Sequence, residues 1–490
     1  METLRPLVAE LQSAEFETKD LQILSLRGRE CISQPFWFEV EVVVRQRLPL
    51  PDGAAPGAPV SLVLSRDDGA ESVTRYVHGI IEAVRDRLDA LLEHRTYVLR
   101  IVPELARLRL VETQEIFLGL SVPEIISQKL GLHDLGGERL RMNADGYPAR
   151  EFVVQYRESD LAFVSRLAEH LGVSFVFEHG ETGRERVIFT DDVVHTGLPA
   201  APPEIAYQAR GEHRGVYFLE VERRMMPTRY FVQDYNYRTP LAEISGQHQL
   251  GDEGTPSGNG GGIIEYGAHH KDKDQGDSLA RIRAEERLSG YEIYSGKSVI
   301  PTLTAGLTTK LTGHPLIGEP DLLIVDVEHT ARFAVDGGLP AAYENGFKAI
   351  SASIRYRPPR VTPRARIHGL VTGTVALGAP ATVGGLAQID DEGRYVVHLH
   401  FDTVAHEGGE KASHPMRMAQ PFAGPNHGMH FPLRPGAEVV IAFMDGDPDR
   451  PIIVGSVPNA IARSTTTSAN SNKNRITSAA GVLIEFGEGK

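Results

Sequence analysis

The sequence contains a single cysteine, Cys31, in 490 residues. An internal disulfide is therefore excluded, and the fold does not depend on an oxidising compartment. No stretch approaches the roughly 20 consecutive apolar residues that span a bilayer. The N-terminus has no basic start followed by an apolar core, so the sequence predicts no secretory signal. If the protein leaves the cell, we expect another assembly to carry it.

Basic residues are in the minority, with 51 Lys and Arg against 65 Asp and Glu and a net charge of -14. A nucleic-acid-binding protein needs a basic face that neutralises phosphates. The largest basic cluster lies within residues 355–366, and we interpret it as a solvated linker rather than an anion site. The sequence therefore predicts no nucleic-acid partner. The arginines of this cluster are Arg355, Arg357, Arg360, Arg364 and Arg366.

Signatures of catalysis are few. Residues 295–298 (Ser-Gly-Lys-Ser) resemble the end of a Walker A loop, but Gly290 lies six positions before Gly296 instead of the required five. The His-Glu-x-x-His and Gly-x-Ser-x-Gly motifs are absent. Aromatic residues make up 7% with Trp37 as the only tryptophan, which gives little support for a sugar-stacking groove. We therefore predict no enzyme and no cofactor, although spacing alone does not reveal a carboxylate pair for cell-wall hydrolysis.

Three side chains that could bind a metal share one face of a predicted strand. His398, His400 and Asp402 lie at alternating positions, and such residue types can ligate zinc. No fourth ligand is fixed by spacing, so an exposed or subunit-facing polar strand is our main interpretation, with a metal site as the alternative. His427 and His430 are expected to be structural, whereas His269 and His270 are expected to lie in a solvated loop.

The strand and helix patterns predict a mainly β protein with α+β insertions. Residues 21–100 contain short β-rich runs separated by Gly/Pro turns, which indicates a barrel or sandwich. A second strand-rich region covers residues 215–356. Within it, the Gly- and Ser-rich residues 251–262 predict a flexible loop, and residues 278–288 predict a helix.

Two further helices are predicted between the strand-rich regions. Residues 121–130 form the first, and an apolar stripe at three- and four-residue steps over 161–171 indicates the second. Ser159 is a suitable N-cap for this helix, and Asp160 places a negative charge at the positive end of its dipole. Gly172 is expected to end the helix, directly before a strand.

The last part of the chain predicts a small barrel. Three prolines in residues 357–366 indicate a stiff linker. About five short strands follow in residues 365–459, which suits a Greek-key barrel of the oligonucleotide/oligosaccharide-binding (OB) type. Residues 445–451 are a turn by composition.

An apolar row follows the barrel near the end of the sequence. After a polar linker at 460–474, Val482, Ile484 and Phe486 alternate as in a strand. On a lone strand this row would face water, at a cost of about 25 cal/mol per Å². We therefore expect neighbouring chains to cover it, or the sequence to be cut from a longer one.

Four motifs can be picked out along the chain, at residues 152–160, 232–240, 393–397 and 446–459. Together they resemble the VgrG family, the spike proteins of type VI secretion systems, which are related to the hub and tail-spike proteins of contractile phages. The first two resemble hub motifs of this family, and the last two resemble its barrel module. The residues singled out as structural or trimer motifs, with the terminal row, are Gln155, Tyr156, Glu158, Ser159, Asp160, Asp234, Tyr235, Gly446, Asp447, Pro448, Asp449, Arg450, Pro451, Val482, Ile484 and Phe486.

The resemblance implies an architecture of tandem hub barrels, an OB-fold barrel and the start of a trimeric β-prism or β-helix needle. On this interpretation residues 1–105 are the first hub barrel, 106–214 an α+β insertion and 215–358 the second hub barrel with a helical insertion. Residues 359–459 are the OB-fold barrel, and residues 460–490 are a linker and the beginning of the needle.

The resemblance also implies a function without catalysis. A homotrimer would cap an Hcp-like hexameric tube, carry a PAAR-like tip protein and effectors, contact baseplate proteins and puncture the target membrane. It would assemble in the cytoplasm and leave with the apparatus. The alternatives are the spike of an extracellular injection particle or phage-like tail, a tail-associated cell-wall-degrading enzyme, and a carbohydrate- or oligonucleotide-binding barrel.

Overall fold

The structure is a computed structural model whose described residues divide into two compact units. None of the helices in the described ranges combines the length and the apolar character needed to cross a membrane. The first unit comprises Met1–Val111, Val122–Tyr147 and Asp160–Pro363, and the second comprises Glu112–Ser121, Pro148–Ser159 and Arg364–Lys490. The described residues are 6–44, 48–67, 72–88, 94–181, 183–196, 198, 202–208, 215–253, 256–334, 341–377, 385–403 and 413–487.

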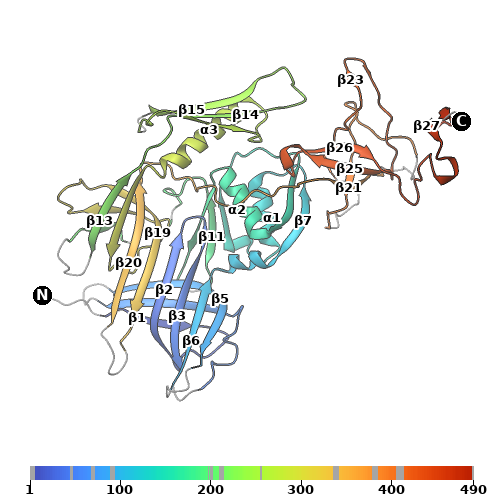
Figure 1. Cartoon of the computed structure of the whole chain (residues 1–490). Helices are drawn as coiled ribbons and strands as arrows, with labels where there is room; N and C mark the ends of the chain where they lie inside the picture. The colour runs from blue at the N-terminus through green and yellow to red at the C-terminus, as the bar shows by residue number, and fades with distance from the viewer. Residues whose placement is uncertain are drawn as a thin grey trace. The chain divides into compact units, whose positions relative to one another are not determined.

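A 12-stranded sheet forms the body of the first unit. Its main path runs in the order β1-β4-β5-β6-β3-β2-β19-β20-β17-β13, and the short β12 and β18 join at β19. The two strand-rich regions of the sequence therefore meet where β2 pairs antiparallel with β19 (Figure 1). The strands are β1 (Val8–Gln12), β2 (Leu21–Cys31), β3 (Gln34–Val44), β4 (Pro59–Asp67), β5 (Ser72–Arg87), β6 (Arg95–Val102), β12 (Glu204–Ala206), β13 (Val216–Arg223), β17 (Glu292–Ser298), β18 (Thr308–Thr312), β19 (Asp321–Arg332) and β20 (Ala342–Ser351).

Alternating burial explains why these segments are strands. In β3, Phe38, Val40 and Val42 are fully buried while the residues between them are partly exposed. A two-residue period places one row of side chains in a core and the other toward solvent. The predicted mainly β architecture is confirmed.

In the described residues of the first unit, two smaller sheets and three α-helices accompany the large sheet. One sheet holds β8 (Leu140–Asn143), β10 (Ser174–Glu178) and β11 (Arg186–Thr190). The other holds β14 (Arg229–Asp234), β15 (Ile244–Glu253) and β16 (Gly262–Tyr266), and α3 covers one of its faces (Figure 1). The helices are α1 (Val122–Gly131), α2 (Asp160–His170) and α3 (Lys273–Leu288), with the short 3-10 turns η2 (Glu104–Leu110) and η3 (Gly137–Arg139).

The predicted ends of α2 and α3 agree with the structure, the latter at Leu288, but the predicted start of α3 does not. Gly172 has a φ of 68°, and the N–H of Val173 bonds back to the carbonyl of Ala168 at 2.9 Å, which ends α2 as expected. By contrast, α3 begins at Lys273 rather than at 278, because the Asp272 side chain accepts a hydrogen bond from the backbone N–H of Gln275 and caps the helix.

The second unit is built on a four-stranded sheet in the order β22-β21-β25-β26. Its core contains the row Tyr395, Val397 and Leu399, which lies on the face of the strand opposite the exposed His398 and His400. The antiparallel pair β7–β9, from the N-terminal half of the chain, adds Ile116 and Val154 to the same core, and Phe152 joins them from the position directly before β9. The elements are β7 (Glu112–Phe117), β9 (Val153–Ser159), β21 (Val371–Val375), β22 (Val397–Leu399), β23 (Ala423–Gly424), β24 (His427–Gly428), β25 (Glu438–Phe443), η4 (Met444–Gly446), β26 (Pro451–Ser456), η5 (Ser468–Asn470), β27 (Lys473–Thr477) and β28 (Leu483–Gly487).

Candidate functional site

The end of the first motif, Asp160, is a buried charge at the start of α2. Asp160 and Lys129 of α1 are each 1% exposed, and Lys129 Nζ lies 3.1 Å from Asp160 Oδ1. His133 Nε2 lies 2.9 Å from Asp160 Oδ2. Removing either charge would break this buried ion pair, which is costly in the interior. Asp160 therefore fixes α1 against α2 in addition to its predicted favourable interaction with the helix dipole.

Residues 152–159, which precede Asp160 in the first motif, contain a β-bulge in the pair β7–β9. The register shifts between Thr113 and Glu115, and Arg157 adopts a φ of 47°. Such a bulge bends a strand and redirects its side chains. The Gln155 side chain is buried and donates to the carbonyl of Glu158 at 3.2 Å. The neighbouring Tyr156 ring meets Phe401 edge to face, with 5.2 Å between centroids.

The second motif, residues 232–240, stabilises a turn before α3 through hydrogen bonds to Asp234. Asp234, at the end of β14, accepts hydrogen bonds from the backbone N–H of Tyr235 at 2.7 Å and of His269 at 2.8 Å. His269 has a φ of 60°, which is an unfavourable backbone conformation, and its hydrogen bond to Asp234 holds it there. Tyr235 itself is exposed.

The expectation that His269 and His270 lie in a solvated loop is wrong for His270, which is 4% exposed. The sequence around it is rich in Lys and Asp, but those residues form the capped start of α3. His270 lies on the buried side of this start, where its ring packs next to Gly276.

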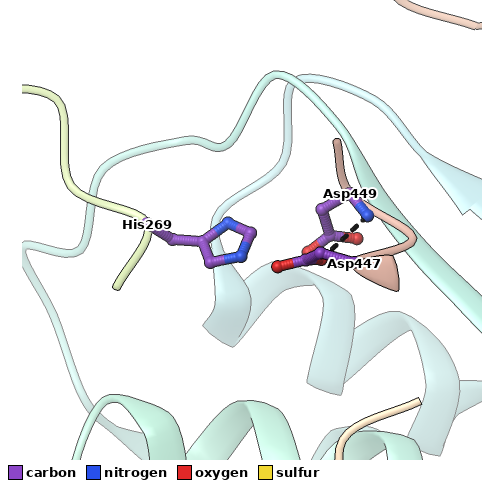
Figure 2. Close-up of side chains that lie close together, drawn as sticks. All are labelled: His269, Asp447 and Asp449. Carbon is purple, nitrogen blue, oxygen red and sulfur yellow. Dashed lines mark hydrogen bonds between the residues drawn. The ribbon is translucent and has the colours of Figure 1, made fainter. Parts of the chain in front are cut away.

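The barrel turn joins β25 to β26 and contacts β9. Figure 2 shows its two carboxylates, where the N–H of Asp449 donates to Asp447 Oδ1 at 3.1 Å. His269, also drawn there, belongs to the first unit. Asp449 Oδ1 accepts the backbone N–H of Val154 at 2.7 Å, and the N–H of Arg450 donates to the carbonyl of Asp447 at 2.9 Å.

The other residues of the motif at 446–451 determine the backbone conformation of the turn. Gly446 has a φ of 71°, which favours glycine, and Pro448 lies inside the turn. Pro451 is the first residue of β26. The motif 446–451 thus forms a turn as predicted, and its link to Val154 is a feature that sequence spacing did not indicate.

The terminal hairpin, β27–β28, presents an apolar row to solvent. Ile476 and Ile484 are paired across the hairpin, so they share a face with Val482 and Phe486. These four side chains, called the apolar row below, are between 46% and 65% exposed. On the opposite face, Glu485 forms ion pairs with Lys473 at 2.7 Å and Arg475 at 2.8 Å.

The candidate metal ligands on β22 and after it do not converge. The ligand atoms of His398, His400 and Asp402 do not gather within 4.8 Å in the part of the chain that the structure describes. Both ring nitrogens of His400 take part in hydrogen bonds of 2.8 Å, with the hydroxyls of Thr372 and Thr374. This arrangement favours the polar-strand interpretation.

Residues 295–298 lie in β17, which is paired with β20 on one side and β13 on the other in the large sheet, and not in a loop. Ser298 is fully buried and donates a hydrogen bond to Asn345 at 2.7 Å. An extended, paired strand cannot wrap its N–H groups around a phosphate, which is what a Walker A loop does.

The interpretation of residues 355–366 as a solvated linker is wrong for Arg357, which is 2% exposed. Arg357 forms an ion pair with Glu285 of α3 at 2.7 Å and donates to the carbonyls of Gly172 and Asp191. Thr362 bonds the buried Glu169 through both its N–H and its hydroxyl. Residues 355–363 therefore form a strap, fixed across α2 and α3 by buried polar contacts that composition alone did not indicate.

A buried polar network at the β2–β19 seam was also missed. Glu30 of β2 contacts Arg75, accepts from Thr304 at 2.9 Å and lies 2.9 Å from His329 Nε2. Burial alone would raise the pKa of Glu30, but the Arg75 charge and the His329 hydrogen bond lower it overall. The available signal was a charged residue in the buried phase of a strand, since Glu30 is in phase with the buried Leu26.

The fold and these motifs define a mainly β hub that carries an OB-type barrel. Two known protein families match parts of this chain. The family described as phage tail baseplate hub (GPD) matches residues 29–335, and the chain belongs to this family. The type VI secretion system/phage-baseplate injector OB domain matches residues 381–457.

Known proteins confirm the resemblance to the VgrG family. The type VI secretion system spike protein VgrG5 of Pseudomonas aeruginosa is 31% identical over 459 residues, with 89% of this chain covered. The chain spans 55 to 60% of the length of VgrG5 and its relatives VgrG1b and VgrG1c.

Two solved structures share the fold. One is an E. coli component of the type VI secretion system, described as similar to the T4 bacteriophage tail proteins gp27 and gp5. It has a TM-score of 0.63 and 24% identity, and the match covers 92% of this chain and all of that chain. A chain of the Francisella PdpA-VgrG complex gives a TM-score of 0.68 at 9% identity, over 99% of this chain and 76% of that chain.

Proposed function

We propose that the chain is the spike and hub of a contractile injection apparatus and works as a homotrimer. It caps an Hcp-like tube, contacts baseplate proteins, carries a PAAR-like tip protein and effectors, and punctures the target membrane. The apparatus delivers it out of the cell. Support comes from the hub family match and from the spike proteins among its relatives.

The observation that carries the proposal is the exposed apolar row of the terminal hairpin. A two-stranded hairpin with one apolar face and one charged face is unstable alone, because two strands cannot bury their own apolar face. Three copies related by a threefold axis would cover the rows mutually and pair the free strand edges. The ion pairs of Glu485 would remain on the other face, in water.

The proposed action is mechanical and requires no catalytic group. Contraction drives the tube forward, and a trimer joined through its hairpins transmits that force to the membrane. The motif residues support this view, since Asp160, Asp234 and Asp449 each hold backbone or helix geometry inside the fold.

The test is the mass of the chain in solution, measured by light scattering after size exclusion at micromolar concentration. The wild type is expected as a trimer. The variant Ile484→Ser/Phe486→Ser should dissociate, whereas the control Glu485→Gln on the opposite face should keep the trimer. A wild-type monomer, or a trimer indifferent to the apolar substitutions, would contradict the proposal.

A functional measurement complements the mass. In a cell with the complete apparatus, replacing the native spike by the Ile484→Ser/Phe486→Ser variant should abolish release of the tube protein into the medium. The Glu485→Gln replacement should leave that release unchanged.

A further inference from the structure

Two buried carboxyl groups meet where η2 and the start of β11 come together. The side chains of Glu104, the first residue of η2, and Glu185, which directly precedes β11, are each 4% exposed. The backbone N–H of Glu104 donates to Glu185 Oε1 at 2.6 Å. These two residues, called the carboxyl pair below, join segments that are 81 residues apart in the sequence. One segment follows β6 of the large sheet, and the other leads into the sheet of β8, β10 and β11.

The positive charge next to the carboxyl pair is smaller than the negative charge that the pair can carry. Arg139 of η3 lies between the two carboxyls, with Nη1 2.8 Å from Glu104 Oε2 and Nη2 3.7 Å from Glu185 Oε1. Arg184 reaches Glu104 Oε1 at 3.4 Å, but its side chain is 56% exposed, so water screens this charge. With both carboxyls ionised, two buried negative charges would face the one mostly buried guanidinium found here among the described residues.

The next arginine in the chain is engaged elsewhere. Arg186, the first residue of β11, lies 2.9 Å from Glu178 Oε2 through its Nη1 and donates through its Nε to the carbonyl of Glu138 at 2.7 Å. Its charge is therefore balanced by Glu178 of the neighbouring strand β10. In the part of the chain that the structure describes, the charged groups that face Glu185 are thus Glu104 from η2 and Arg139 from η3.

One oxygen of Glu185 is left without a hydrogen bond. Glu185 Oε2 is buried and has no hydrogen-bond partner within the described ranges. A buried anionic oxygen without a partner is far more costly than a neutral one, and the neighbouring carboxyl of Glu104 adds repulsion. The geometry therefore favours a protonated Glu185 in the closed structure. Burial raises the pKa of Glu185 from 4.5 to about 7, in agreement with this geometry.

A short route connects the carboxyl pair to water, since Glu181, Gly183 and Arg184 are all exposed. A local displacement of residues 183–185 would carry the Glu185 carboxylate into solvent. We propose that the carboxyl pair is a proton-controlled joint. With a proton on Glu185, η2 stays fixed to the segment before β11, whereas ionisation of Glu185, with its proton released to water, favours an open joint. All of these groups lie in one chain, so the joint does not depend on the trimer proposed above.

Proton linkage gives the direction of the pH effect. The closed joint binds the proton more tightly than the open joint, in which the pKa of Glu185 returns to 4.5. The closed state is therefore fully favoured below pH 4.5 and loses this advantage as the pH rises through 7. The equilibrium constant for opening should rise about 70-fold between pH 5 and pH 8, about tenfold of it between pH 6 and pH 8, and then level off.

Hydrogen exchange of the full chain, followed by mass spectrometry, measures this rise. Exchange is recorded at pH 5, 6, 7 and 8 and divided by the intrinsic rate at each pH. Peptides that cover residues 104–110 and 183–190 should lose protection by about tenfold between pH 6 and pH 8.

Two variants assign the effect to Glu185. Glu185→Gln should remove the rise, because an amide does not ionise. The matched control, Glu181→Gln at an exposed position four residues earlier, should keep it. A wild type whose protection does not change with pH, or a rise that persists in Glu185→Gln, overturns the proton-controlled joint.

Infrared spectroscopy gives a second readout, which stays informative even where Glu185→Gln fails to fold. A protonated buried carboxyl has a C=O stretching band that its ionised form lacks. In the wild type this band should be present at pH 6 and lost by pH 8. Glu104→Gln should move the loss to lower pH, because Glu185 would then have Arg139 to itself and no carboxylate beside it. A band that does not change between pH 6 and pH 8, or a midpoint that Glu104→Gln leaves in place, also overturns the proposal.

Discussion

Buried charges in this molecule hold helices in place, and the pair Lys129 and Asp160 is the sharpest case. Both side chains are 1% exposed. Asp160→Ala should destabilise the first unit by about 3–5 kcal/mol, because Lys129 would be left charged in the interior. The double variant Lys129→Met/Asp160→Asn should recover most of that loss, since no lone charge remains. Denaturant unfolding measures both changes.

The control for that prediction is the surface pair Lys273 and Asp277, one helical turn apart on α3. Lys273→Met should change the free energy of unfolding by no more than about 0.5 kcal/mol, because exposed pairs contribute little. If Asp160→Ala were as mild as Lys273→Met, the buried pair would not stabilise the fold as described.

Glu185 gives the first unit a dependence on pH near neutrality. Burial raises the pKa of its carboxyl from 4.5 to about 7, despite the nearby backbone donors and Arg139. A raised pKa means that protonation favours the folded state. This contribution is fully present below pH 4.5 and is lost as the pH rises through 7.

Glu185→Gln should therefore flatten the pH profile of stability between about pH 5 and 8. Its advantage over the wild type should grow with pH, by at most about 1.4 kcal/mol per unit. Urea midpoints at pH 5, 6, 7 and 8 measure this difference. Parallel profiles for the two proteins would show that Glu185 does not titrate in this range.

At the scale of elements, the strap of residues 355–363 depends on a glycine at the end of α2. A Cβ on Gly172 would lie 2.8 Å from both Arg357 Cδ and Ile282 Cγ2, and the residue has a φ of 68°. Gly172→Ala should cost about 2–4 kcal/mol, from the left-handed conformation and the overlap together.

The matched control for that substitution is Gly137, whose φ is 61° and whose added Cβ would meet nothing within 4 Å. Gly137→Ala should cost only the conformational part, about 1 kcal/mol. Thermal and denaturant unfolding of both variants separate the two contributions. Equal losses would mean that the strap yields freely to the new methyl group.

The local part of this arrangement could be predicted from the sequence, and the non-local part could not. The end of α2 follows from Gly172 alone, and the inward row of β22 follows from simple alternation. Burial of Arg357 depends on Glu285 and on two carbonyls far away in the chain. Residues 254 and 255 of the predicted flexible loop lie outside the described residues.

The candidate site also has a local part that the sequence predicts and a non-local part that it does not. Val482, Ile484 and Phe486 of the apolar row could be predicted because they alternate along one strand, whereas Ile476 joins them only by pairing with Ile484 across the hairpin. The hydrogen bond between the Val154 N–H and Asp449 joins positions 295 residues apart in the sequence. Neither hydrophobic periodicity nor motif spacing predicts such a contact, because it forms only when distant segments of the chain meet in the fold.

At the scale of the whole molecule, the large sheet makes the first unit cooperative across its two halves. Its main core contains Leu62 from β4 together with Ala331 of β19 and Tyr343 of β20. Leu62→Ala should cost about 2–5 kcal/mol. Because residues Ser25–Cys31 of β2 pair with Asp326–Arg332 of β19, the loss should also reach the second half.

Hydrogen exchange followed by mass spectrometry measures this coupling. In Leu62→Ala, peptides from β20 should lose protection together with peptides from β4, although the two strands lie far apart in the sequence. The control Leu88→Ala, at an exposed position in the same half, should leave both sets of peptides unchanged. If exchange rose only in residues 6–102, the two halves would unfold separately. The seam at Glu30 and His329 would then be a contact between independent barrels rather than the interior of one sheet.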